Sequence, residues 1–141
     1  MKVTAINGSP RKKWNTAQLL QEALKGAESV GAETELINLY DLNYKGCISC
    51  FGCKRKGGTP CHCYLNDDLS LVLETVLGSD VLLLGSPVYF GNTTGEMRSF
   101  LERLAFITMT YDDYSAQIFS RAYRFCLLLH NECRRRFRIN V

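Results

Sequence analysis

The stretch SDVLLLGSPVYFGNTTGEMRSFLERLA, residues 79–105, decides the fold because it joins a strand to a helix through one long turn. Four consecutive branched aliphatic residues, 81–84, predict a strand that is covered on both faces. Thr93 and Glu96 have the spacing of a capping box, which predicts the start of a helix. The apolar residues that would form the buried stripe of this helix are Met97, Phe100, Leu101 and Leu104.

The rest of the chain shows the same alternation of short apolar runs and helical patterns. Residues 2–6 form a β-branched run that ends at the breaker pair Asn7-Gly8, which predicts a strand. Helices between strands imply an α/β fold, in which right-handed crossovers cover both faces of a parallel sheet. Without a repeat or a linker, residues 1–141 are expected to form a single domain. The other elements are expected as a helix at 16–30 with a capping box of Asn15 and Gln18, a strand at 33–39, a helix that ends at Leu77 and is capped by Asn66 or Asp67, and a strand at 123–129.

Composition and charge narrow the class of protein. The 141 residues are 46% hydrophobic and 22% charged, an ordinary globular composition that can bury a core. The net charge of +3 is local, because residues 121–141 carry six arginines against one glutamate. The basic tail at 130–141 is therefore expected to be a solvated end, and no nucleic-acid partner is expected. No run reaches the ~18 apolar residues of a membrane span, and no signal-peptide core follows Met1, so we expect a cytoplasmic protein without a membrane partner.

A ligand of an open parallel sheet binds where the strands end, and two segments fall at such ends. The first, NGSPRKKWNT at 7–16, lacks both the G-x-G-x-x-G and the G-x-x-x-x-G-K-[ST] patterns of nucleotide-binding loops. The alternative that its polar residues only form a turn and a cap stays open from this loop alone. It nevertheless offers a helix N-terminus and side-chain donors that suit one phosphate group, namely Ser9, Arg11, Asn15 and Thr16.

The second segment, GSPVYFGNTTG at 85–95, follows the most apolar strand. Pro87 stiffens the turn, and Gly91 lets the backbone approach a flat ligand. Tyr89 and Phe90 could stack on a ring, although aromatic residues at a strand end more often belong to the core or the surface. Two such loops at one edge of the sheet favour a shared binding site.

Five cysteines lie in the loop at 45–66, and the residues alone leave more than one interpretation open. A disulfide framework is not expected, because the chain has seven cysteines, an odd number, and no export signal. Reduced free thiols are the simplest interpretation. The cysteines of the loop are Cys47, Cys50, Cys53, Cys61 and Cys63. A tetrahedral zinc site could use all of them except Cys53.

Three segments in this order, NGSPRKKWNTAQLL, GCISCFGCK with the later CYLNDDL, and SDVLLLGSPVYFGNTTGEMRSFLERL, resemble the flavodoxin-fold NAD(P)H-dependent FMN reductases, in the branch that includes the iron–sulfur flavoproteins. The resemblance covers residues 1 to about 115 and implies a flavodoxin-like three-layer α/β/α fold. It implies that the phosphate of FMN is held by Ser9, Arg11, Asn15 and Thr16. It also implies that the flavin ring and its ribityl chain lie along Pro87, Val88, Tyr89, Phe90, Gly91 and Asn92. A third loop would fall near His130 and Asn131.

The resemblance gives the cysteines a role as well. In the iron–sulfur flavoproteins a C-x2-C-x2-C motif and a later fourth cysteine hold a [4Fe–4S] cluster. Cys47, Cys50 and Cys53 match the first three positions, and the fourth is either Cys61 or Cys63. Free thiols, a cluster and zinc are preferred in that order. A cluster with four thiolates is negatively charged, and four basic residues could offset this negative charge: Lys45, Lys54, Arg55 and Lys56.

The implied function is that of an FMN-dependent NAD(P)H oxidoreductase, which passes a hydride from the nicotinamide nucleotide to the flavin and electrons on to a quinone, free flavin, other small molecule or protein. A homo-oligomer, either a dimer or a tetramer, is expected. The chain departs from the family after the fourth strand, so a fifth strand and a last helix are expected to be lacking, which would leave an open sheet edge. The alternative function is a non-catalytic truncated flavodoxin-like module or a zinc-binding interaction protein.

Overall fold

The computed structural model describes residues 1–57, 59, 61–109 and 124–130, the last segment by its backbone alone. Strands and helices alternate along this part of the chain. Their bounds are β1 (Lys2–Asn7), α1 (Asn15–Glu28), β2 (Glu33–Asn38), α2 (Leu69–Leu77), β3 (Val81–Pro87), α3 (Gly95–Thr108) and β4 (Arg124–His130), with two short 3-10 turns, η1 (Leu39–Asp41) and η2 (Gly52–Lys54).

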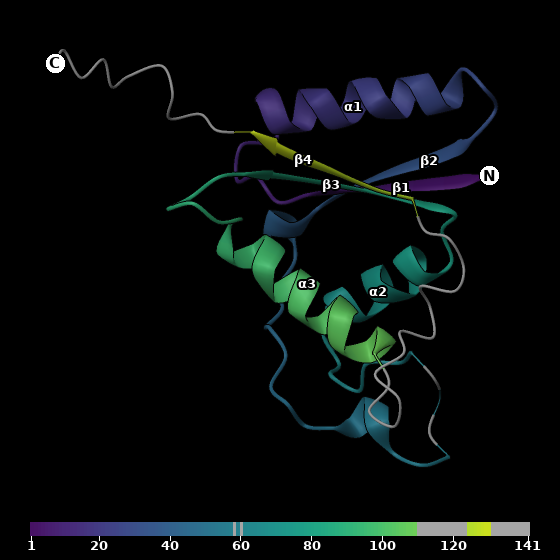
Figure 1. Cartoon of the computed structure of the whole chain (residues 1–141), viewed down its shortest axis with the longest axis vertical. Helices are drawn as coiled ribbons and strands as arrows, with labels where there is room; N and C mark the ends of the chain where they lie inside the picture. The colour runs from purple at the N-terminus through teal and green to yellow at the C-terminus, as the bar shows by residue number, and fades with distance from the viewer. Residues whose placement is uncertain (58, 60, 110–123, 131–141) are drawn as a thin grey trace, which may run out of the picture.

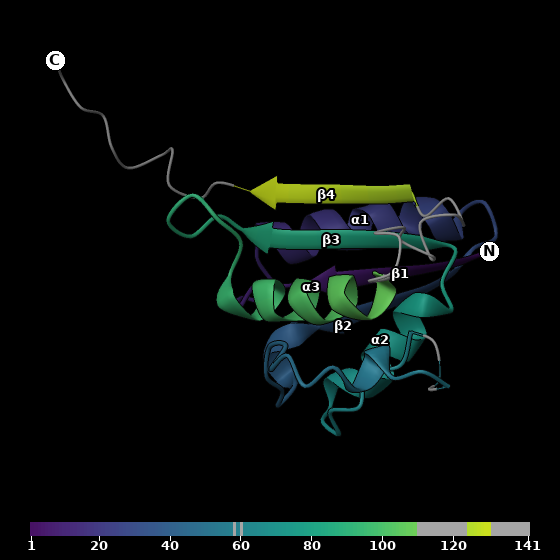
Figure 2. The same ribbon diagram turned by 60° about the horizontal axis from the view of Figure 1, so that its bottom comes forward.

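The four strands form one parallel sheet in the order β2-β1-β3-β4. The central strand β1 pairs with both neighbours, so that Val3 lies opposite Thr34 of β2 and Val81 of β3. Helix α1 covers one face of the sheet, and α2 and α3 cover the other, as Figures 1 and 2 show. The predicted three-layer α/β architecture with a parallel sheet is thus confirmed.

The alternation of side chains along the strands divides the core into two layers. Val3 and Ala5 of β1 and Leu83 of β3 pack with α1 in one cluster. Ile6 of β1 and the β3 residues on either side of Leu83 pack with α2 and α3 in a larger cluster. Because both faces are covered, β3 is apolar at successive positions, which explains its unbroken run of aliphatic residues.

Helix α1 lies close to β3 at Gly85. A Cβ atom on Gly85 would lie 2.7 Å from Leu20 Cδ1 and 3.0 Å from Thr16 Cγ2, both on α1. Such distances are too short for any side chain, so this position needs glycine for the helix to approach the sheet.

The predicted cap of α1 is wrong. The helix begins at Asn15, so its N-cap is Trp14, whose side chain makes no capping hydrogen bond. Gln18 uses its Nε2 group to donate to the carbonyl oxygen of Lys13, at 3.2 Å, instead of capping the backbone. The first turn of α1 also carries no acidic residue. Its N-terminus is therefore suited to an external anion.

The predicted caps of the other two helices are wrong as well, and neither Asn66 nor Asp67 is the N-cap of α2. Helix α2 begins at Leu69 and has Asp68 as its N-cap, but the carboxylate of Asp68 accepts from the backbone N–H of Asn43, at 2.7 Å. In α3 the N-cap is Thr94 and not Thr93, since Thr94 Oγ1 accepts from the backbone N–H three residues later.

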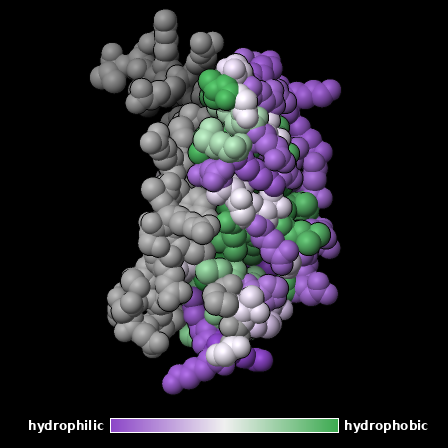
Figure 3. Space-filling model, turned by 90° about the vertical axis from the view of Figure 1, so that its right-hand side faces the viewer, coloured by the Kyte–Doolittle hydropathy of each residue, from purple (hydrophilic) through white to green (hydrophobic). Residues whose placement is uncertain are grey.

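The cysteine-containing loop lies on the outer side of the α2–α3 layer, away from the sheet, in both ribbon views (Figures 1 and 2). Figure 3 faces the edge at which the strands begin, where hydrophobic residues form a band beside hydrophilic ones. The loops that follow the strands lie at the opposite edge. Among the described residues, no helix has both the length and the apolar character that a membrane span requires. The predictions for the tail, for Asn131 and for a lacking fifth strand and last helix concern residues outside the described ones.

Candidate functional site

The loops after β1 and β3 are joined at the carboxyl edge of the sheet. The backbone N–H of Gly8 donates to the carbonyl oxygen of Gly85, at 2.7 Å. The hydroxyl group of Thr94 donates to the carbonyl oxygen of Gly8, also at 2.7 Å. A Cβ atom on Gly8 would lie 2.9 Å from Met97, so the glycine permits this close contact. The two predicted ligand loops therefore meet, as the sequence predicted.

The loop after β1 is shaped by hydrogen bonds inside it. Asn7 Oδ1 accepts from the backbone N–H of Ser9, at 3.0 Å, and Asn7 Nδ2 donates to Asn38 Oδ1 of β2, at 2.8 Å. Ser9 is buried, and its Oγ accepts from the backbone N–H of Arg11, at 3.1 Å. The guanidinium of Arg11 lies over the ring of Trp14, 4.3 Å from its centroid. This stacking holds a positive charge beside the start of α1.

Thr16 stands out in this loop because its hydroxyl group is buried and has no partner among the residues that the structure describes. Its side chain is on the first turn of α1, and the residue is only 1% exposed. Thr16 Oγ1 makes no hydrogen bond in the described structure. A buried hydroxyl without a partner is costly and calls for an explanation such as a bound ligand. Asn15, the first residue of α1, is exposed.

The loop after β3 makes a tight two-residue turn. The backbones of Tyr89 and Asn92 exchange hydrogen bonds, at 2.8 and 3.0 Å. Phe90 and Gly91 between them both have positive φ, 50° and 77°, as a type I′ turn requires. The turn leaves the ring of Phe90 fully exposed and that of Tyr89 partly exposed. Pro87 is the last residue of β3, and Val88 is half-buried beyond it.

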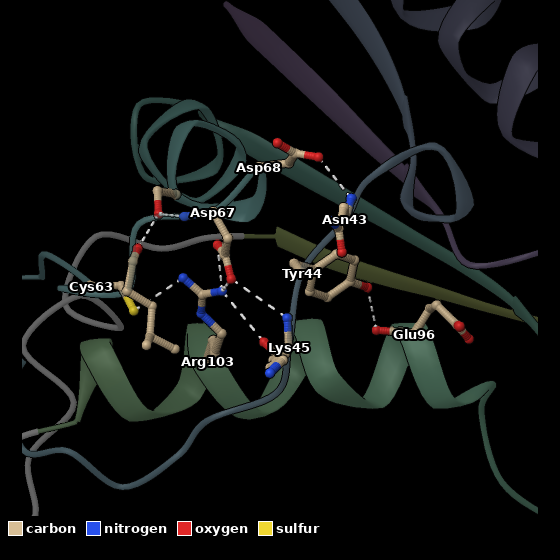
Figure 4. Close-up of polar contacts among 10 residues, drawn as sticks. Asn43, Tyr44, Lys45, Cys63, Asp67, Asp68, Glu96 and Arg103 are labelled. Carbon is tan, nitrogen blue, oxygen red and sulfur yellow. Dashed lines mark hydrogen bonds and ion pairs between the residues drawn. The ribbon is translucent and has the colours of Figure 1, made fainter.

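Two tyrosines lie beside the start of α3. The hydroxyl group of Tyr44 donates to the backbone carbonyl of Glu96, at 2.7 Å (Figure 4). Burial, together with hydrogen bonding to Glu96, raises the pKa of Tyr40 to about 12. Burial and the nearby charge of Glu96 also raise the pKa of Tyr44. Both phenols therefore keep their protons to a higher pH than an unperturbed tyrosine does. His130, the residue predicted near a third loop, ends β4 opposite Pro87.

Four of the five cysteines of the outer loop line one pocket. Besides the cysteines, its walls include the aromatic rings of Phe51, Tyr64 and Phe106, and Arg103. The cysteines that line it are Cys47, Cys50, Cys53 and Cys63. Cys61 is not among the lining residues. Within the described residues, no three histidine, cysteine or acidic side chains are grouped so as to hold one metal ion. The four cysteines thus line one pocket without forming such a group.

The backbone of this loop has an unusual conformation. Three of its residues have positive φ angles, which residues other than glycine rarely adopt. They are Ser49 (53°), Phe51 (54°) and Cys61 (59°). Phe51 packs edge-on against Phe106 of α3, with 5.6 Å between the ring centroids. Burial raises the pKa of the thiols of Cys53 and Cys61. Strained backbone of this kind persists where surrounding contacts fix it, and it is typical of functional loops.

Two residues that hold the site together were not predicted from the sequence. Thr94 was overlooked in favour of Thr93, and the hydrogen bonds of its hydroxyl group with Met97 and Gly8 distinguish the two. Arg103 is 1% exposed, although it is charged. Its signal was present in the sequence, because Arg103 falls between Phe100 and Ile107 at helical spacing on the buried face of α3.

Comparisons with known proteins agree with this arrangement. A family model described as NADPH-dependent FMN reductase matches residues 1–120. The chain belongs to this family. The resemblance to the FMN reductases that the three motifs carried is thereby confirmed. An iron–sulfur flavoprotein of Methanocaldococcus jannaschii is 40% identical over 103 residues, which cover 73% of this chain and 51% of that protein.

Solved structures of flavoenzymes share the fold. An NAD(P)H:quinone oxidoreductase from Methanothermobacter marburgensis matches with a TM-score of 0.68 at 17% identity, over 94% of this chain and 67% of that one. An FMN-dependent NADH-azoreductase from Bacillus anthracis, solved in complex with FMN, matches with a TM-score of 0.63 at 14% identity, over 92% of this chain and 68% of that one. Like other members of the FMN reductase family, the chain therefore has a flavodoxin-like fold. It spans about half the length of the iron–sulfur flavoproteins that it matches.

Proposed function

We propose that this member of the FMN reductase family is an oxidoreductase that binds FMN at the two joined loops and uses NADH or NADPH to reduce a quinone, free flavin or other small acceptor. The observation that carries the proposal is the buried, unpartnered hydroxyl group of Thr16 at the start of α1. When bound, FMN supplies the hydride transfer, and the protein supplies binding, orientation and electrostatics.

The residues of the first loop fit a phosphate group. The hydroxyl group of Thr16 can donate a hydrogen bond to a phosphate oxygen. The first turn of α1, which has no side-chain cap, offers backbone N–H groups to an anion. Arg11, held over Trp14, adds a positive charge. Ser9 shapes the loop through Arg11, and Asn15 is exposed at the helix start. We assign Ser9, Arg11, Asn15 and Thr16 to phosphate binding.

The second loop supplies a surface for the flavin ring. We assign it the backbone and side chains of Pro87, Val88, Tyr89, Phe90, Gly91 and Asn92. The type I′ turn fixes the backbone of this segment, and Tyr89 and Phe90 present aromatic surface to the solvent. An exposed ring at a fixed position is suited to stacking on a flat ligand, because burying it there removes apolar surface from water.

Replacement of Thr16 by valine tests the phosphate assignment. Valine keeps the branched shape that packs near Gly85 but lacks the hydroxyl group. Loss of one hydrogen bond to a charged phosphate should cost about 1–3 kcal/mol, or roughly 5- to 150-fold in affinity for FMN. Riboflavin, which has the ring but no phosphate, serves as the control ligand and should bind both proteins equally. Equal affinity of both proteins for FMN would overturn the assignment.

We propose further that Cys47, Cys50, Cys53 and Cys63 hold a [4Fe–4S] cluster, for which their arrangement around one pocket is the support. Such a cluster would supply one-electron transfer. The lining of the pocket, which includes Cys63 but not Cys61, supports Cys63 as the fourth ligand. A zinc site has less support, because one of its four cysteines, Cys61, does not line the pocket. The other three would be Cys47, Cys50 and Cys63.

Anaerobic purification followed by iron, sulfide and zinc analysis tests the cluster. We expect four iron atoms per chain in the unmodified protein, loss of iron in Cys63→Ser, and retention of iron in Cys61→Ser. Iron lost only in Cys61→Ser would reverse the ligand assignment. A colourless protein that binds no flavin and oxidises no NAD(P)H would favour the non-catalytic or zinc-binding alternative. A dimeric or tetrameric state stays a prediction for size-exclusion chromatography.

A further inference from the structure

A charged side chain of α3 is buried beside the cysteine pocket. Arg103 is 1% exposed, and its Nη1 group donates to both carboxylate oxygens of Asp67, at 2.7 and 2.6 Å (Figure 4). Its Nη2 group donates to the sulfur of Cys63, at 3.2 Å. Arg103 therefore connects the fourth cysteine of the pocket to a fixed carboxylate.

The stability of the protein does not explain this arrangement well. Burial disfavours the charge of Arg103, and its contacts with Asp67 and Cys63 offset that effect. Its Nε–H group is buried and has no partner within the described residues. Buried ion pairs are often no more stable than apolar side chains of the same size, and an unpaired donor adds a cost. A role in the cysteine site accounts for the burial better.

The same guanidinium also reaches the beginning of the cysteine loop. Arg103 Nη1 lies 3.4 Å from the carbonyl oxygen of Lys45, two residues before Cys47. Asp67 Oδ2 accepts weakly from the backbone N–H of Lys45, at 3.5 Å. Figure 4 shows Lys45 on one side of Arg103 and Cys63 on the other. One side chain therefore holds together the two ends of the segment that carries all four pocket cysteines.

We propose that Arg103 is the positioning residue of the cysteine site: its guanidinium, fixed by Asp67, closes the ends of the loop and holds a positive charge against the sulfur of Cys63. This inference rests on the proposed cluster for its electrostatic part, and on the protein alone for its positioning part. A cation that donates a hydrogen bond to a ligand sulfur stabilises the more negative, reduced state of a cluster. Arg103 should therefore raise the reduction potential.

The first experiment needs no metal. Amide hydrogen exchange, measured by mass spectrometry on the metal-free protein, reports the order of residues 44–67. The variant Arg103→Met/Asp67→Asn removes this clamp between Arg103 and Asp67 without leaving the partly buried carboxylate of Asp67 unpaired. We expect exchange across this segment to be at least tenfold faster than in the unmodified protein. Arg98→Met is the matched control, because Arg98 lies on the same helix but is exposed and pairs with Glu102.

The second experiment uses protein that has been reconstituted anaerobically with iron and sulfide. The double variant should show a reduction potential that is lower by at least a tenfold change in the redox equilibrium, about 59 mV for a one-electron couple. Arg103→Lys keeps a positive charge but loses the two-pronged contact with Asp67. Its potential should stay nearer that of the unmodified protein, while its loop exchanges faster.

The outcomes separate this inference from the proposed function. If the unmodified protein binds no iron, the proposed cluster is wrong. The exchange experiment still tests whether Arg103 holds the two ends of the loop together. Unchanged exchange across residues 44–67 in the double variant overturns the positioning role. A potential that is the same in the double variant, in Arg98→Met and in the unmodified protein overturns the electrostatic role.

Discussion

Thr94 links the two candidate flavin loops through a single hydroxyl group, and its replacement by valine tests whether they form one unit. The side chain is fully buried. Its Oγ1 accepts from the backbone N–H of Met97, at 3.3 Å, and donates to the carbonyl oxygen of Gly8, at 2.7 Å. Valine has nearly the same shape, so Thr94→Val removes these two hydrogen bonds without opening a cavity.

The expected cost follows from the two lost contacts. Removal of a helix N-cap costs about 1 kcal/mol. A buried carbonyl oxygen left without its donor costs about 1–3 kcal/mol. Thr94→Val should therefore lower the free energy of unfolding by roughly 2–4 kcal/mol, taking the two costs together. In a chain of this size each kcal/mol shifts the melting temperature by about 4 °C.

Urea unfolding of the flavin-free protein, followed by circular dichroism, measures this loss. Thr93→Val is the matched control, because the neighbouring threonine is not the cap, and it should change stability by less than about 0.5 kcal/mol. Thr94→Ser keeps the hydroxyl group and should lose only about 1 kcal/mol for the buried methyl group. A weaker affinity for FMN in Thr94→Val than in Thr93→Val is also expected. If Thr94→Val unfolded at the same urea concentration as Thr93→Val, the hydrogen bonds of Thr94 between the loops would contribute nothing to the stability of the protein.

Two further predictions concern packing and pH. Gly85→Ala should destabilise the protein by roughly 1–3 kcal/mol, because its Cβ would lie 2.7 Å from Leu20. Gly26→Ala, in the last turn of α1 with open space around it, should stabilise the protein by at most about 0.5–1 kcal/mol. Urea unfolding compares the two variants, and equal effects would contradict the close packing of α1 on β3. The pKa of Tyr40 is raised to about 12 by burial and by Glu96, so the folded state keeps a proton that the unfolded state loses above pH 10, and stability should fall as pH rises from 10 toward 12. Unfolding at pH 9 and pH 11 should show a smaller fall in Tyr40→Phe, and an identical fall in both proteins would refute this origin.

The layers of the fold were predictable because each depends on a local pattern. The run at 81–84 predicted a strand with both faces covered, and β3 has both faces covered. The caps of the helices were not predictable, because adjacent residues in the sequence were equally suitable as caps. Thr93 and Thr94 both precede the helix at plausible spacing. The hydroxyl group of Thr94 caps the helix by accepting from the backbone N–H of Met97, and it donates to the carbonyl oxygen of Gly8, which lies 86 positions away in the sequence.

The cysteine site shows the same limit. Spacing alone allowed either Cys61 or Cys63 as the fourth cysteine, because both follow the C-x2-C-x2-C motif within the same loop. The lining of the pocket includes Cys63 but not Cys61, and that lining depends on α3, which supplies Phe106 and Arg103. Which cysteines of the motif line the pocket thus depends on an element far along the chain.

Helix α3 provides a physical reason for the two candidate sites to respond to one another. Thr94 at its N-cap joins the flavin loops, and Arg103 lies nine residues further on, about 14 Å along the axis at ~1.5 Å per residue. The helix is packed along its length through Met97 and Phe100, both fully buried. A packed helix moves as a unit more readily than it bends. A displacement of α3 at one end should therefore also displace its other end. Arg103→Met/Asp67→Asn should then change the affinity for FMN more than Arg98→Met does, although neither substitution touches the flavin loops.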